Sequence, residues 1–190
     1  MPYPYLMARP TTRPTGRSLT FGENEVIVSK TDLKGIITYA NDVFLRVSGY
    51  KESEILGQAH NTIRHPDMPG CIFRLLWNEI QAGREIFAYV NNLAKNGSNY
   101  WVFAHVTPSF NGRGQVVGYH SNRRVPFPDA MPKVEALYTR LLAEERRINN
   151  RAQAVQRSLE LLESDLKRMG VSYSEFVFSL SMHTQLSASN

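Results

Sequence analysis

The alternation of apolar and polar residues predicts strands at both ends of the first two thirds of the chain. Short apolar runs at residues 26–28 and 36–40 flank turn-forming residues at 31–35, which is typical of a β-hairpin. Three further apolar runs are separated by turns that contain Asn-Gly, the strongest local indication of a hairpin. These runs cover residues 87–93, 100–106 and 116–122. The pattern therefore predicts five antiparallel strands.

Helical patterns lie between the second and third of these strands. Asn41 can cap a short helix that Gly49 ends, and another short helix follows at residues 53–57. Apolar residues within 72–80 share one face of a longer helix, which ends at Gly83. The order of elements predicts an α+β fold with a five-stranded antiparallel sheet and helices on one face.

From Pro132 onward the apolar positions follow a heptad period. They are spaced alternately four and three residues apart over about five heptads, which is typical of a coiled coil. Glu145 is the only charged residue in this stripe. We therefore expect one long helix over residues 128–170 that forms a homodimer, with a monomeric helix packed on the sheet as the alternative. Residues 171–190 suit a short helix or a partner-docking tail.

Composition restricts the class of protein. With 190 residues, 42% of them hydrophobic, the chain can bury one core of ordinary domain size and still have residues left for extensions. Arg9, Arg13 and Arg17 precede the first acidic residue and supply three of the net +5 charges, so residues 1–22 are expected to form a flexible basic tail. No run of Lys and Arg is interleaved with aromatic residues, so nucleic acid is not an expected partner.

The sequence is that expected of a cytoplasmic protein. Its single cysteine, Cys71, rules out an internal disulfide and fits a reducing compartment. No apolar stretch approaches the ~20 residues that span a bilayer, and residues 1–20 lack the apolar centre of a signal peptide. Recruitment to the inner face of the membrane through a receptor would be compatible with the same features.

The loop at residues 60–69 has the composition of a ligand-binding segment. It contains two His, an Arg, an Asp and two Pro, and it leads into a helix. Pro66 and Pro69 each favour extended backbone at the residue before them, and Pro69 suits the start of a helix. A stiff polar loop directed at a helix N-terminus suits an anionic or phosphorylated ligand. A surface loop that only caps the helix is the alternative.

Six segments together resemble a known family. They are residues 38–44, 47–50, 55–58, 63–69, 95–97 and 100–102. With the order of elements, they are similar to the FAD-binding PAS domain of bacterial aerotaxis receptors. The Arg-His-Pro-Asp-Met-Pro run is the most specific of them, whereas Asn-x-x-Phe and Ser-Gly-Tyr occur in many PAS domains.

This resemblance implies an organisation and a function. Residues 23–127 would form a PAS sensor domain that holds FAD noncovalently and senses redox state for aerotaxis or energy taxis. Residues 128–170 would carry the signal to a chemoreceptor or another signalling protein in trans, unless the chain is part of a longer receptor. An enzyme is not expected, because no paired carboxylates, nucleophile with a base or metal-ligand spacing occurs in the sequence.

The resemblance also implies the residues that contact FAD. Arg64, His65 and Asp67 would bind it, with Asn41 near the pocket and Asn92 at the isoalloxazine edge. Arg64 can pair with a pyrophosphate and Asp67 can brace the loop or a ribose, while the Asn92 amide can both donate and accept hydrogen bonds. His65 could respond to flavin charge, because its ordinary pKa lies near working pH.

At the start of the third strand the chain has Phe87, where the family often has a tryptophan. A phenylalanine still stacks on a flavin or an adenine, but it lacks the indole N–H. This difference puts the tightness of binding and the redox potential in question. Trp77 and Trp101 are expected in the core.

Two other functions stay open. The first is a haem PAS domain that senses gas, with His60, His65, His105 or His120 as the iron ligand. The second is a PAS module without a ligand that acts as a dimerisation adaptor. An absorption spectrum would distinguish all three, because flavin, haem and an empty pocket differ in the visible range.

Overall fold

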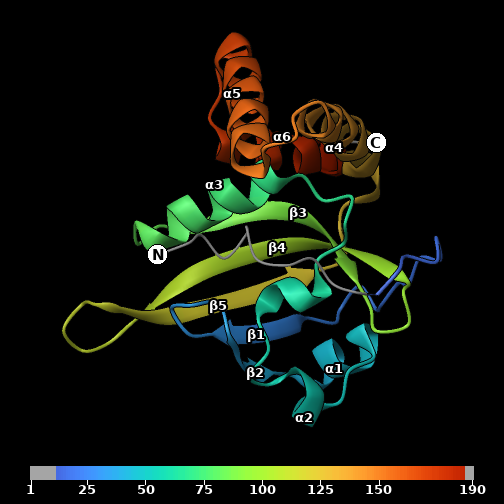
Figure 1. The fold of residues 1–190 in the computed structure, drawn as a ribbon, viewed down its shortest axis with the longest axis vertical. Coiled ribbons are helices and arrows are strands. Elements are labelled where there is room, and N and C mark those ends of the chain that lie inside the picture. Colours follow the sequence, from blue (N-terminus) through green and yellow to red (C-terminus); the bar gives the residue numbers. More distant parts are fainter. Residues whose placement is uncertain (1–11, 187–190) are drawn as a thin grey trace.

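The computed structural model describes residues 12–186, with side chains as far as residue 180. Its strands are β1 (Ile27–Thr31), β2 (Ile37–Ala40), β3 (Ile86–Leu93), β4 (Asn99–Phe110) and β5 (Val116–Arg124). They form one antiparallel sheet in the order β2-β1-β5-β4-β3 (Figure 1). The predicted α+β fold with a five-stranded sheet is confirmed.

Helices fill the connection between β2 and β3. They are α1 (Asp42–Ser48), α2 (Glu52–Ile55), the 3-10 helix η2 (His60–Ile63) and α3 (Gly70–Gln81). α3 contacts β3 and β4, because Ile72, Leu76 and Ile80 recur every fourth residue and form one buried face. α1 packs against β1, nearer the opposite edge of the sheet.

The prediction of one long helix over residues 128–170 is wrong. The segment forms the 3-10 helix η3 (Pro128–Ala130), α4 (Met131–Arg146) and α5 (Arg151–Met169). Asn150 causes the break, because its side chain accepts a hydrogen bond from the Gln153 N–H and so starts a new helix. Ion pairing of Arg140 with Asp165 shows that α4 and α5 run antiparallel, as a helical hairpin.

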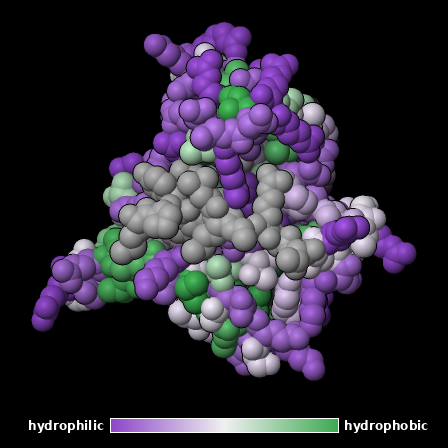
Figure 2. Space-filling model, in the orientation of Figure 1, coloured by the Kyte–Doolittle hydropathy of each residue, from purple (hydrophilic) through white to green (hydrophobic). Residues whose placement is uncertain are grey.

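Most of the heptad stripe is buried within this one chain. Its residues pack between the two helices, on α3 and beside β3; the buried members are Val134, Tyr138, Leu141, Val155, Leu159, Leu162 and Leu166. On the side shown in Figure 2 the outer surface over α5 is largely hydrophilic. The apolar pattern is therefore satisfied by the hairpin, without the dimer partner that the coiled-coil interpretation required.

The C-terminal helices also reach around the edge strand β3 to the other face of the sheet. There Trp101 contacts Tyr138 of α4, and Phe87 contacts Phe178 of α6 (Tyr173–Leu186). The presence of α6 confirms the short helix that was one of two alternatives for residues 171–190. Residues 187–190 lie outside the described part of the chain. Among residues 12–186, no helix combines the length and the apolar character needed to cross a membrane.

The described part of the expected N-terminal tail is docked on the sheet. Thr15 N–H donates to the Gly97 carbonyl, and Arg17 and Leu19 exchange backbone hydrogen bonds with Asn99. Gly97 is required there, because it has a φ of 84° and a Cβ would lie 2.4 Å from the Arg13 carbonyl oxygen. The prediction that residues 1–22 form a flexible tail is therefore wrong for residues 15–19. Arg9, which was assigned to the same tail, lies outside the described residues.

The helical hairpin can be tested by distance measurement. Nitroxide labels on the exposed positions Ala136→Cys and Lys167→Cys, in a Cys71→Ala background, would lie about 46 Å apart in one continuous helix of ~1.5 Å rise per residue. We expect pulsed electron spin resonance to give less than half that distance, because the antiparallel hairpin brings these positions together. A distance close to that of the continuous helix would contradict the hairpin.

Candidate functional site

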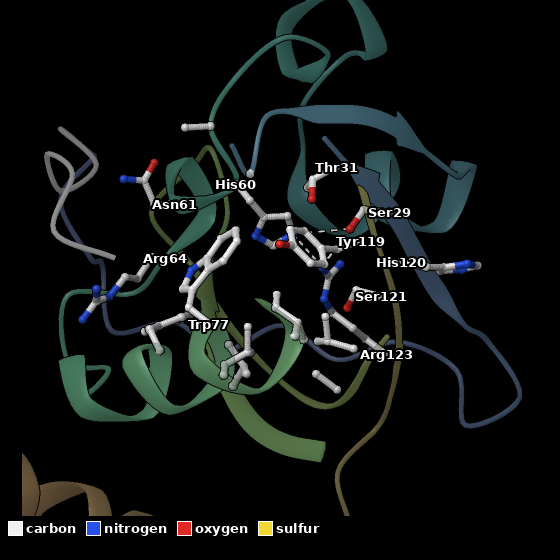
Figure 3. Close-up of a pocket in the computed structure, with 18 of the residues that line it drawn as sticks. Ser29, Thr31, His60, Asn61, Arg64, Trp77, Tyr119, His120, Ser121 and Arg123 are labelled. Atoms are coloured by element: carbon white, nitrogen blue, oxygen red, sulfur yellow. Dashed lines mark hydrogen bonds between the residues drawn. The ribbon is translucent and has the colours of Figure 1, made fainter. Parts of the chain in front are cut away.

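A cavity lies between the inner face of the sheet and the segment formed by η2 and α3 (Figure 3). It holds about 870 Å³ of atom-free space, including its opening to solvent. Apolar walls come from Phe73, Leu76, Trp77, Ile80, Val90, Ala104 and Val106. Its polar lining includes Ser29, His60, Asn61, Arg64, Asn92, Ser121 and Arg123. An apolar cavity with a few convergent polar groups is typical of a cofactor or small-molecule site.

A buried arginine dominates the polar lining. Arg123 Nη2 donates to His60 Nε2 at 2.6 Å and to Ser29 Oγ at 2.8 Å, and the residue is only 3% exposed (Figure 3). Burial lowers the pKa of Arg123 to about 10, so its guanidinium stays charged near neutral pH. Among the described residues, no carboxylate forms an ion pair with it. The cavity therefore contains an uncompensated positive charge.

His60 is the neutral acceptor for this charge. Burial, and next the charge of Arg123, lower the pKa of His60 to about 3. The imidazole therefore stays neutral at physiological pH, and its Nε2 can accept a hydrogen bond from the guanidinium. The sequence analysis did not identify Arg123 as a residue of the cavity, because an arginine in a strand usually faces solvent. Without Arg123, the role of His60 as its hydrogen-bond acceptor could not be predicted either.

Buried polar atoms of the lining that have no hydrogen-bond partner among the described residues include Asn92 Nδ2, Ser121 Oγ and Arg123 Nη1. A buried donor left without a partner costs about 1–3 kcal/mol. Two of the three atoms are N–H donors and the third is a hydroxyl, so they fit a ligand that presents hydrogen-bond acceptors.

The predicted ligand loop is fastened to the edge of the sheet. The His65 N–H donates to the Asn91 carbonyl at 3.3 Å, and the Asn91 N–H contacts Met68 Sδ at 3.2 Å. Arg64 lines the cavity, where its guanidinium donates to the Met68 carbonyl at 2.8 Å and lies over the ring of Phe73. The loop is thus part of the cavity wall and not a free surface loop.

Of the other predicted contacts, Asn92 also lines the cavity, whereas His65 and Asp67 do not. His65 is buried within the loop, where its Nδ1 accepts from the Asp67 N–H at 3.1 Å, and this burial lowers its pKa. The Asp67 carboxylate is exposed and pairs with Arg146 at 2.9 Å. Asp67 therefore lies outside the lining of this cavity, and its contact with FAD stays a prediction.

Asn41 lies outside the cavity lining and forms hydrogen bonds with the backbone instead. Its Oδ1 accepts from the backbone N–H groups of Val28 and Phe44, at 2.9 and 3.0 Å, and its Nδ2 donates to the Val26 carbonyl at 2.8 Å. It thus caps α1, as predicted, and ties this helix to the chain at the start of β1.

Phe87 lies on the opposite face of the sheet from the cavity. Its ring stacks on His105, with centroids 4.1 Å apart, and contacts Phe178 of α6. Side chains alternate along a strand, so residues five apart, such as Phe87 and Asn92, point to opposite faces. The prediction that Phe87 stacks on the ligand is therefore wrong.

Comparisons with known proteins agree with this architecture. Residues 37–123 match the family described as the PAS fold. The aerotaxis receptor of Escherichia coli (strain K12) is 39% identical over 129 residues, which is 68% of this chain and 25% of the receptor. The nitrogen fixation regulatory protein of Klebsiella pneumoniae is 29% identical over 99 residues, 52% of this chain and 20% of that protein. The chain thus spans about a quarter or less of the length of these relatives.

A solved light-oxygen-voltage domain, from a study with a flavin analogue, is similar in structure. It has 24% sequence identity and a TM-score of 0.51, and the match covers 58% of this chain and 85% of that domain. At this identity the likeness concerns the fold alone. It supports the assignment of β1 to β5 and their intervening helices to a PAS architecture.

The neutral state of His60 predicts a pH dependence of stability. In the unfolded chain His60 titrates near 6.5 and in the folded chain near 3, so the unfolded state binds more protons between these values. Stability should therefore fall as the pH drops below 6.5, by up to about 1.4 kcal/mol per pH unit from this residue. In His60→Gln, which keeps an acceptor for Arg123, urea denaturation at about pH 7 and about pH 5 should show a smaller loss than in wild type. His120→Gln is the control, and an equal change in both variants would contradict the assignment.

Proposed function

This chain contains a PAS domain similar to that of the aerotaxis receptor, and we propose that the domain binds FAD and acts as a redox sensor. The observation that carries the proposal is a set of three buried, unpartnered polar atoms that converge on a largely apolar cavity. Asn92, Ser121 and Arg123 supply these atoms, and the apolar walls between them suit a flat aromatic ring. An isoalloxazine has an apolar edge and an edge that carries carbonyl groups, so its chemistry matches this lining.

The lining also suits the remainder of the cofactor. Arg64 and Lys34 add two positive charges to the cavity wall, and Asn61 adds an amide. Guanidinium groups bind phosphate oxygens through charge-assisted hydrogen bonds. Arg64 is therefore the residue that would hold the diphosphate, as the sequence suggested.

When bound, FAD would supply reversible uptake of electrons. Arg123 would favour the more negatively charged state of a ligand in the cavity, because its charge is buried and the described structure gives it no carboxylate partner. His60 keeps this charge uncompensated, since it accepts a hydrogen bond while remaining neutral. The pair would thus set how readily the bound cofactor is reduced.

The signal would leave the domain through the helices that follow β5. We propose a chemoreceptor or another signalling protein as the partner in trans, in the cytoplasm or at the inner face of the membrane. A homodimer would have to use a surface other than the part of the heptad stripe that is buried in the hairpin. Aerotaxis or energy taxis is the process that this arrangement would serve.

Absorption spectra of the purified chain reconstituted with FAD test the proposal directly. We expect flavin bands that co-purify with the protein, and an affinity about tenfold lower in Asn92→Ala, the equivalent of one lost hydrogen bond. Asn91→Ala is the matched control, because this neighbouring amide faces the other side of the sheet and bonds to Asn99. An intense haem band, or the absence of any retained chromophore, would reject FAD.

A redox titration tests the role of Arg123. Removing the buried charge in Arg123→Gln should lower the reduction potential of bound FAD by roughly 60 mV or more, a tenfold change in a one-electron equilibrium. Arg124→Gln removes a charge from the next, exposed residue of the same strand and should leave the potential nearly unchanged. Equal potentials in the two variants would show that the buried charge does not act on the cofactor.

A further inference from the structure

The N-terminus of α3 is capped by a residue 75 positions later in the chain. Pro69 precedes the helix and offers no side-chain hydrogen bond. Instead, the Glu145 carboxylate of α4 accepts from the Gly70 N–H at 3.0 Å and from the Cys71 N–H at 3.1 Å. An anionic side chain is well placed here, because the first N–H groups of a helix lack internal partners and the helix dipole is positive at this end.

The same carboxylate also binds α5. Ser158 donates its hydroxyl to Glu145 Oε1 at 2.7 Å, so one side chain joins α3, α4 and α5. The fit is tight, since a Cβ on Gly70 would lie 2.5 Å from Val155 Cγ2. We call the contacts of Glu145 with Gly70, Cys71 and Ser158 the clasp. The pair of Arg146 with Asp67 lies beside it, but both groups are exposed and contribute little.

The clasp adjoins the wall of the cavity. Gly70 follows directly on the loop at residues 60–69, which contains Arg64, and Arg64 lines the cavity. Met68, in the middle of the loop, is fully buried and accepts the Arg64 hydrogen bond through its carbonyl. Because this segment is short and buried, a shift of the α3 N-terminus would move Arg64, and a shift of Arg64 would act on the clasp.

We propose that Glu145 is a positioning residue that couples the α4–α5 hairpin to the cavity. Docking of the hairpin holds the loop in its binding position, and a ligand that holds Arg64 in turn stabilises the docked hairpin. Such coupling is reciprocal by thermodynamic linkage, so each event strengthens the other by the same factor. The identity of the ligand rests on the proposed function, whereas the link between hairpin and loop does not.

Cys71 provides a built-in reporter of hairpin docking. It is the single cysteine of the chain, lies in the clasp and is fully buried. Burial also raises the pKa of its thiol to about 12, so it reacts slowly while α5 covers it. The rate of maleimide labelling of the full chain, with and without added FAD, therefore measures how often the hairpin undocks.

We expect Glu145→Gln to label about tenfold faster than wild type and to bind FAD more weakly by a similar factor, within the usual range of coupling between sites. Glu144→Gln is the matched control, because among the described residues this adjacent acid forms its ion pair with the exposed Arg147, and the variant should behave as wild type. Gly70→Ala provides a second, steric route, since its new methyl group would push α5 away without a change of charge. Added FAD should slow labelling of the wild type.

The outcomes separate the two proposals. Equal labelling rates of Glu145→Gln and Glu144→Gln would contradict the proposed role of Glu145. Faster labelling of Glu145→Gln with an unchanged FAD affinity would contradict it as well. If the wild type binds no FAD, the proposed function fails, but faster labelling in both Glu145→Gln and Gly70→Ala would still support the docking role of Glu145. Agreement of these two variants also shows that the effect comes from displacement of the hairpin and not from a local change at one side chain.

Discussion

The structure of the cavity depends on one constraint, which is that the guanidinium charge of Arg123 is buried without a carboxylate partner among the described residues. Moving a charge out of water costs several kcal/mol unless hydrogen bonds replace its hydration. In the described structure Arg123 donates two such bonds, to the neutral groups of Ser29 and His60, and its Nη1 has no partner. Such a group needs a further hydrogen-bond partner from the cavity, which water or a ligand can supply, so the charge supports the proposed binding site.

The sheet and its turns were predictable because their information is local. Asn-Gly turns and alternating apolar residues fixed the three C-terminal strands, and Asn41 was correctly identified as a helix cap. The site was only partly predictable. Arg64 and Asn92 line the cavity, but the alternation that places Asn92 inward also places Phe87 outward, and applying that rule would have excluded Phe87. Arg123 could not be found from its own position, because the sequence does not reveal which face of β5 is covered.

The C-terminal segment shows a different limit. A heptad stripe indicates that a helix buries one face. It does not indicate whether the surface that covers this face belongs to the same chain or to another. Two details of the sequence favoured the hairpin. Asn149-Asn150 places a good N-cap in the middle of the stripe, and Glu145 puts a charge where a coiled coil would bring two carboxylates together. In the structure this carboxylate has a partner, the N-terminus of α3, which no periodicity of α4 could have indicated.

The charge in the cavity and the carboxylate in the clasp act on the same short segment. His60 is held at one end by Arg123, residues 64 and 65 are held by the edge of β3, and Gly70 is held at the other end by Glu145. A segment fixed at three points within a close-packed core shifts as a unit, because such cores do not deform continuously. A change of charge beside Arg123 would alter its hydrogen bond to His60 and would thereby act on a segment whose far end meets α4 and α5. Residues 60–71 therefore form one physical connection from the cavity to α4 and α5, beside the direct contacts of α3 with α5 and of β3 with α4.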